Sequence, residues 1–100
     1  MGYRKVNAPK YWIPKEMEDY IEGKVISTDG VIETVYGEMG YISLLTENNE
    51  QINVGLSASL KIMAEMIREG DDIKIVYNGE EFNKKTKRRF KSFDLYIAEE

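Results

Sequence analysis

The chain has 100 residues, of which 42% are hydrophobic and 32% charged, so it is long enough for one buried core and too apolar for a disordered chain. Neither Cys nor His occurs, which excludes disulfides, thiolate metal sites and the commonest general base, and we do not expect an enzyme. The net charge is −4, but positive and negative residues are unevenly distributed along the chain. Residues 1–15 hold four bases and no acid, residues 84–91 hold six bases, and the remainder is acidic. Because exposed charges are screened beyond about 10 Å in moderate salt, a basic segment can still attract a polyanion.

Residues 1–19 contain two prolines and no clear period, which predicts an extended N-terminal arm ahead of a single domain over residues 20–100. The chain has no run of roughly 20 apolar residues and no apolar segment typical of a secretory signal after its basic start, so we expect a cytoplasmic location and no membrane contact. Lys10, Tyr11 and Trp12 bring bases and aromatic rings together within the arm. The arm could close over a bound nucleic-acid strand, or Trp12 could cover an open seam of the sheet, and the sequence leaves both open.

The first half of the domain has the pattern of three strands. Residues 20–28 are rich in β-branched and aromatic residues and end at the turn signal Asp29-Gly30. Residues 31–36 either continue this strand past a bulge at Gly30 or form a separate hairpin, and residues 37–40 form a turn. Residues 41–46 and 51–56 are predicted as the second and third strands.

The period then changes to that of a helix over residues 58–69, with a serine at its start and Gly70 where a left-handed C-cap belongs. Two further strands are predicted over residues 73–77 and 93–97, joined by a long basic connection. Alternation places one face of the third strand and one face of the fifth strand in the core, with the inward set Ile52, Val54, Leu56, Phe93, Leu95 and Ile97.

The resulting order, strand-strand-strand-helix-strand-strand, makes the chain all-β with one helix and resembles the five-stranded barrel of the OB-fold. This resemblance implies a ligand lying across the second and third strands, between loops at residues 29–40 and 79–90. The segment from Asp71 to Gly79, the Lys-rich hairpin after it and the ending Phe93–Ile97 are similar to small phage-type single-stranded DNA-binding proteins.

The basic segment between the last two strands combines cations with an aromatic ring. Cations release counterions from a phosphate backbone, and an exposed ring offers a face on which a base can stack. The segment could also be a solvated hairpin whose lysines prevent aggregation at a sheet edge. The candidate binding residues here are Lys84, Lys85, Lys87, Arg88, Arg89, Phe90 and Lys91.

Alternation on the second and third strands places Tyr41, Ser43, Gln51 and Asn53 opposite the apolar residues of the same strands. We therefore expect these four side chains to point outward, where Tyr41 would stack on a base and the amides would contact the ligand. A register error of one residue would reverse this assignment.

The function predicted from these features is sequence-independent binding of single-stranded DNA by backbone electrostatics and aromatic stacking, without cofactor or metal. The resemblance implies a role in phage or mobile-element replication or recombination, with replication or recombination proteins and a second copy of the chain as further partners. RNA is the near alternative ligand. A module that binds a protein through its acidic body or a sheet edge is the alternative from a different class.

Overall fold

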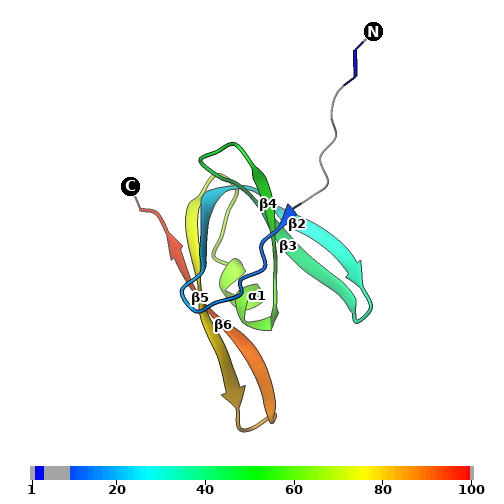
Figure 1. Ribbon diagram of the computed structural model, residues 1–100, viewed down its shortest axis with the longest axis vertical. Helices are drawn as coiled ribbons and strands as arrows, with labels where there is room; N and C mark the ends of the chain where they lie inside the picture. Colours follow the sequence, from blue (N-terminus) through cyan, green and yellow to red (C-terminus); the bar gives the residue numbers. More distant parts are fainter. Residues whose placement is uncertain (1, 4–9, 100) are drawn as a thin grey trace.

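The computed structural model describes residues 2–3 and 10–99, which form one curled, mainly antiparallel sheet with a single short helix (Figure 1). No helix in this part of the chain is long and apolar enough to cross a membrane. In chain order the elements are β1 (Lys10–Tyr11), β2 (Tyr20–Thr34), β3 (Gly37–Leu45), β4 (Gln51–Gly55), α1 (Ala58–Ala64), β5 (Asp72–Asn83) and β6 (Arg88–Ile97).

The strand count and the closure of the sheet differ from the five-stranded barrel expected from the sequence. Six strands lie in the order β1-β4-β3-β2-β5-β6. The additional strand, β1, comes from the arm and pairs in parallel with β4. Within residues 2–3 and 10–99 no pairing joins the first and last strands of this order, so the sheet is a half-barrel with a seam between the β1–β4 pair and β6.

The first long strand continues past Asp29-Gly30. Of the two alternatives left by the sequence for the residues after Gly30, a continued strand or a separate hairpin, the first is therefore correct. β2 runs from Tyr20 to Thr34, with register shifts between Val25 and Gly30 against β3. These irregularities bend the strand, so that its first part pairs with β5 and its second part extends with β3 as a hairpin beyond the core.

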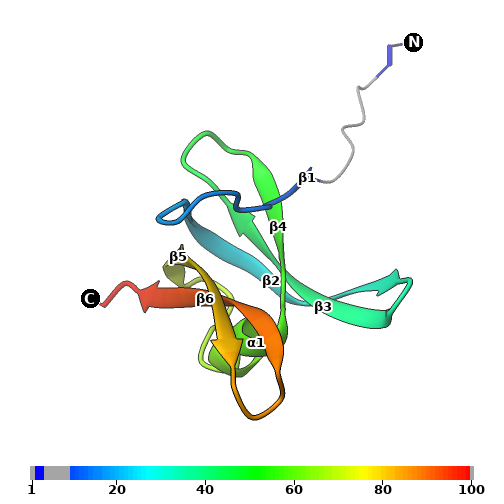
Figure 2. The ribbon, with the colours of Figure 1, turned by 60° about the horizontal axis from the view of Figure 1, so that its bottom comes forward.

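The basic connection expected within residues 79–90 is a hairpin, as the sequence indicated, but its two strands stay paired much farther than predicted. β5 and β6 remain paired up to Asn83 and Arg88, beyond a bulge between Tyr77 and Glu80 where Gly79 adopts φ +86°. Opposite charges face each other across the ladder, as at Glu80 and Lys91, which favours the pairing. Figures 1 and 2 show the β2–β3 and β5–β6 hairpins projecting from the core in different directions.

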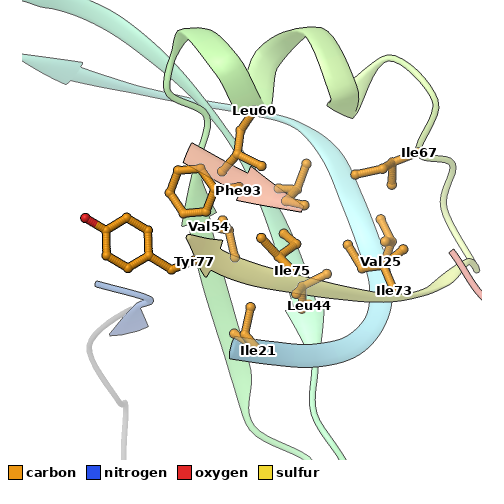
Figure 3. Close-up of a cluster of buried hydrophobic side chains, with 11 residues drawn as sticks. Ile21, Val25, Leu44, Val54, Leu60, Ile67, Ile73, Ile75, Tyr77 and Phe93 are labelled. Carbon is orange, nitrogen blue, oxygen red and sulfur yellow. The ribbon is translucent and has the colours of Figure 1, made fainter. Parts of the chain in front are cut away.

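The helix is shorter than the expected range of 58–69, because the chain leaves helical geometry after Ala64 and descends through turns to Gly70. Ile67 beyond the helix is nevertheless buried, and Gly70 at φ +92° donates its N–H to the Val25 carbonyl. The helix packs against β6, and its Leu60 points into the side chains of the sheet (Figure 3).

The core lies on the concave face of the sheet and agrees with the predicted inward set. Val54 and Phe93 are buried, and Ile52, Leu56, Leu95 and Ile97 pack against the core from partly exposed positions. The buried hydrophobic residues are Ile21, Val25, Ile42, Leu44, Val54, Leu60, Ile67, Ile73, Ile75, Tyr77 and Phe93.

The described part of the arm, from Lys10 to Asp19, is held to the sheet at both ends. At one end the Trp12 N–H donates to the Asn53 carbonyl over 2.8 Å. At the other, the Glu18 N–H donates to the Tyr77 carbonyl over 2.7 Å and the Tyr77 N–H donates to the Asp19 carbonyl over 2.8 Å. The arm therefore spans from β4 to β5 across the open side of the half-barrel.

Candidate nucleic-acid interface

The tip of the β5–β6 hairpin is built by Asn83. Its side-chain oxygen accepts the N–H groups of Lys85 and Thr86 over 2.9 and 3.3 Å, and its carbonyl accepts the Lys87 N–H over 2.8 Å. These bonds satisfy the backbone of a four-residue connection in which Lys87 has φ +56°. With the backbone bonded locally, the lysine side chains of the turn are exposed to solvent.

We call the segment from Lys84 to Lys91 the basic hairpin. All six of its cationic residues are exposed. Among the described residues, a single ion pair involves them, between Arg89 Nη1 and Glu80 Oε2 at 3.9 Å, and both side chains of this pair are more than half exposed. Such a pair is weak in water, so the cationic charge of the basic hairpin is available to an anionic ligand.

The strand geometry of β6 arranges these residues on two faces. Arg89, Lys91 and Phe93 are alternate residues and share one face, at intervals of roughly 6.6 Å. Phe82 of β5 lies directly opposite Arg89 in the register and is exposed. Phe90 belongs to the other face of the hairpin and is 39% exposed. Each face of the basic hairpin thus carries cations together with an exposed ring.

At the foot of the basic hairpin, the unpaired seam contains a mostly apolar pocket of about 380 Å³, which we call the seam pocket. Trp12 of the arm lies at one side, and its ring centroid is 5.9 Å from that of Phe93. The pocket is lined by Tyr11, Trp12, Ile13, Pro14, Ile32, Met39, Val54, Gly55, Ser57, Leu60, Lys91 and Phe93. Trp12 is half-buried against the core, so it covers the seam, which is one of the two roles left open by the sequence.

The expected outward, ligand-facing position of Ser43 and Asn53 is wrong. Ser43 is only 3% exposed and Asn53 only 5%, and the Ser43 hydroxyl donates to Asn53 Oδ1 over 2.7 Å. Alternation does place them opposite Ile42 and Val54, but the arm adds β1 beside β4, with Tyr11 in register with Asn53. Both polar side chains are therefore buried partners of each other.

The other residues predicted on this face are divided among different surroundings. Tyr41 is half-buried and meets Tyr11 edge-to-face, with ring centroids 6.1 Å apart. Gln51 is exposed at the start of β4. Lys10 Nζ lies 2.9 Å from Glu50 Oε2, so this arm lysine already has an acidic partner. The structure therefore brings Tyr11, Trp12 and Lys91 to one pocket and leaves Gln51 and Lys10 apart from it.

Two surface features were missed at the level of sequence. Lys74 Nζ lies 4.7 Å from the centre of the Tyr20 ring on the outer face, opposite Tyr96 in the register. Strand parity alone could have grouped these residues. The β2–β3 hairpin exposes Val35 and Tyr36 at 93% and 97%, on a stretch that contains acids and no base.

The described residues contain no group of three or more His, Cys, Asp or Glu side chains that could hold a metal ion. One carboxylate has a distinct environment: Asp19 accepts the N–H groups of Glu16 and Lys15 over 3.0 and 2.9 Å. These two hydrogen bonds, the one from Glu16 contributing most, lower the pKa of Asp19 below its ordinary value of 3.8. The two bonds stabilise the turn of the arm between Lys15 and Asp19.

No protein-family model matches the chain, and comparison with curated proteins and with solved structures gives no match.

Proposed function

We propose that the protein is a non-catalytic, sequence-independent binder of single-stranded nucleic acid, with DNA favoured over RNA. The observation that carries the proposal is the basic hairpin: six exposed cations on a projecting β-ribbon, only one of which has an acidic partner among the described residues. A polyanion gains from such a ribbon because each phosphate contact releases condensed counterions.

Exposed aromatic rings beside these cations support a single-stranded ligand rather than a duplex. Phe82 and Phe90 lie on opposite faces of the hairpin, and both are exposed. In a duplex the faces of the bases are stacked and inaccessible, whereas an unpaired strand can place bases against such rings. Cations contact phosphates and rings stack on any base, so a surface of this kind binds without sequence preference.

We further relate the sheet to an OB-type barrel that is open between β4 and β6 and carries β1 as an additional strand. Together with the similarity of the segments 71–79 and 93–97 to phage-type single-stranded DNA-binding proteins, this relation extends the proposal to replication or recombination.

A protein partner is the second candidate, favoured by the β2–β3 hairpin. Val35 and Tyr36 are almost fully exposed at its tip, and no Lys or Arg occurs between residues 25 and 60. An apolar tip on an acidic ribbon fits a protein surface with basic and apolar residues. This surface is separate from the basic hairpin, so both functions can coexist (Figure 2).

The proposal is tested by anisotropy titration of a labelled poly-thymidine strand, with duplex DNA and an RNA strand of the same length as comparators. We expect preference for single strands and affinity that falls steeply with salt. Absence of binding to any of the three ligands at low salt would exclude a nucleic-acid function and leave the protein-binding candidate.

A further inference from the structure

The seam pocket has the features of a binding site, and its inner wall is formed by the core residues Val54, Leu60 and Phe93. Its volume of about 380 Å³ lies near the lower end of the range of about 300–1,000 Å³ in which proteins bind small organic groups. Most of its lining is apolar, and Trp12 and Phe93 supply aromatic rings. A flat, aromatic group is the class of ligand that such walls accept.

The pocket also contains a polar atom without a partner. The Ser57 hydroxyl is buried and makes no hydrogen bond, although a buried hydroxyl normally has one. Ser57 stands at the N-cap position of α1, yet its side chain does not cap the helix. The neighbouring Ser59 hydroxyl, in contrast, donates to the Lys91 carbonyl over 2.9 Å. The hydroxyl oxygen itself is buried beside the pocket, so its free donor and acceptor capacity becomes available to a group inside the pocket after a rotation of the Ser57 side chain.

The position of the pocket links it to the phosphate-binding surface. Lys91 belongs both to the pocket lining and to the basic hairpin, and Arg89 follows on the same face of β6. Because Phe93, Lys91 and Arg89 alternate along one strand face, the face passes from an aromatic wall to two cations within four residues. A nucleotide has the complementary form, with an aromatic base joined through a sugar to an anionic phosphate.

We propose that the seam pocket binds one unstacked nucleobase of a single strand whose backbone runs along the basic hairpin. The base lies against Trp12 and Phe93, its polar edge meets the Ser57 hydroxyl, and its phosphate lies near Lys91. This inference rests on the proposed function and deepens it, because a base must be unpaired to enter the pocket. The pocket would thus contribute to the preference for single strands over duplexes.

The test compares a poly-thymidine oligomer with an abasic oligomer of the same length and charge, using Trp12 fluorescence and anisotropy in parallel. Trp12 is the only tryptophan of the chain, so tryptophan emission reports on the surroundings of this one residue at the wall of the pocket. We expect the thymidine strand to change Trp12 emission and to bind at least about fivefold more tightly than the abasic strand, with similar salt slopes for both.

Two variants at one position separate pocket volume from the hydroxyl. Ser57→Leu fills the pocket and should reduce binding of the thymidine strand to that of the abasic strand. Ser57→Ala keeps the volume and removes only the hydroxyl, so it should retain the Trp12 response with a smaller loss of affinity. Because the hydroxyl has no partner to lose, Ser57→Ala should leave the melting temperature unchanged or raise it.

The two proposals fail in different ways. Equal, salt-dependent affinity for both strands with no change in Trp12 emission would overturn the base pocket and leave the nucleic-acid function intact. Absence of binding to either strand at low salt would overturn both. Full base-dependent binding by a folded Ser57→Leu variant would also contradict the pocket, whatever the wild-type fluorescence.

Discussion

The triple substitution Lys87→Ala, Arg88→Ala and Arg89→Ala removes half of the cations of the basic hairpin. If all six contact phosphates, the logarithm of the affinity for a single strand should fall with the logarithm of salt concentration with a slope of about −4, since each contact contributes about −0.7. The variant should show a slope of about −2. A roughly fourfold rise in salt should then weaken wild-type binding by roughly 300-fold and the variant by only about 20-fold.

The substitutions should leave the fold intact. The one ion pair they remove, between Arg89 and Glu80 at 3.9 Å, is exposed to solvent, and such pairs contribute less than about 1 kcal/mol. Lys87 has φ +56°, and since alanine also carries a Cβ, the backbone strain at this position does not change. The melting temperature of the variant should therefore stay close to that of the wild type.

A matched control removes three positive charges elsewhere, through Lys24→Ala, Arg68→Ala and Lys74→Ala. Lys74 lies near the start of β5, and Lys24 of β2 pairs with Asp72 at that same end. Along an extended strand, Lys74 is about 30 Å from Asn83, where the turn of the basic hairpin begins. The control has the same net charge as the hairpin variant and should keep the wild-type slope. Equal salt slopes for the wild type and the hairpin variant would refute the assignment of the phosphate contacts to the basic hairpin. An equal decrease of the slope in the hairpin variant and in the control variant would show that binding depends on net charge alone.

Three further predictions concern stability. Asn53→Ala leaves the buried Ser43 hydroxyl without its partner and should lower the free energy of unfolding by about 1–3 kcal/mol. Unchanged affinity of the folded variant for the single strand would confirm that the pair does not contact ligand, and a marked loss of affinity would contradict it. Gly30→Ala places a Cβ 2.3 Å from a Tyr41 ring atom and should cost about 1–3 kcal/mol in urea unfolding; an unchanged midpoint would show that the ring does not pack there. The lowered pKa of Asp19 means that its carboxylate stabilises the fold above its ordinary value of 3.8 and that this contribution is lost as pH falls through the lowered pKa. The stability difference between wild type and Asp19→Asn should accordingly be present near neutral pH and vanish in acid, and a difference that grows in acid would contradict the assigned hydrogen bonds.

The parts of the fold that depend on local pattern could be predicted from the sequence. Alternation and the change of period identified five of the strands, the position of the helix and most of the core, including Val54 and Phe93. The bounds of the helix were too long, because Ile67 has helical spacing from Leu60 and Met63 but reaches the core from a turn.

The parts that depend on pairing between distant segments could not be predicted. β1 has two residues and exists only because Lys10 and Tyr11 pair with Ile52 and Asn53, about forty residues away. The burial of Ser43 and Asn53 follows from this pairing. A Lys-rich hairpin was expected between the last two strands, but not the length of its paired strands, because only the cross-strand partners show that the pairing extends to Asn83 and Arg88.

The candidate site also has one part that the local sequence predicts and one part that depends on contacts between distant segments. The cations of residues 84–91 are evident from composition, and their exposure agrees with the expectation. The seam pocket is not evident, because it is formed by the arm, both hairpins and the start of α1, and because Ser57 and Met39 carry no sequence signal for ligand binding. Its recognition required the relative placement of elements that are far apart in the chain.

The central claim, that single-stranded nucleic acid binds along the basic hairpin and at the seam pocket, is tested most directly by mapping amide chemical shifts during titration with poly-thymidine. The account predicts shifts concentrated on residues 84–93 and on Tyr11 and Trp12, with little change around Lys24 and Asp72 at the far end of the sheet. Shifts confined to the acidic β2–β3 hairpin, or none at saturating strand concentration, would contradict it.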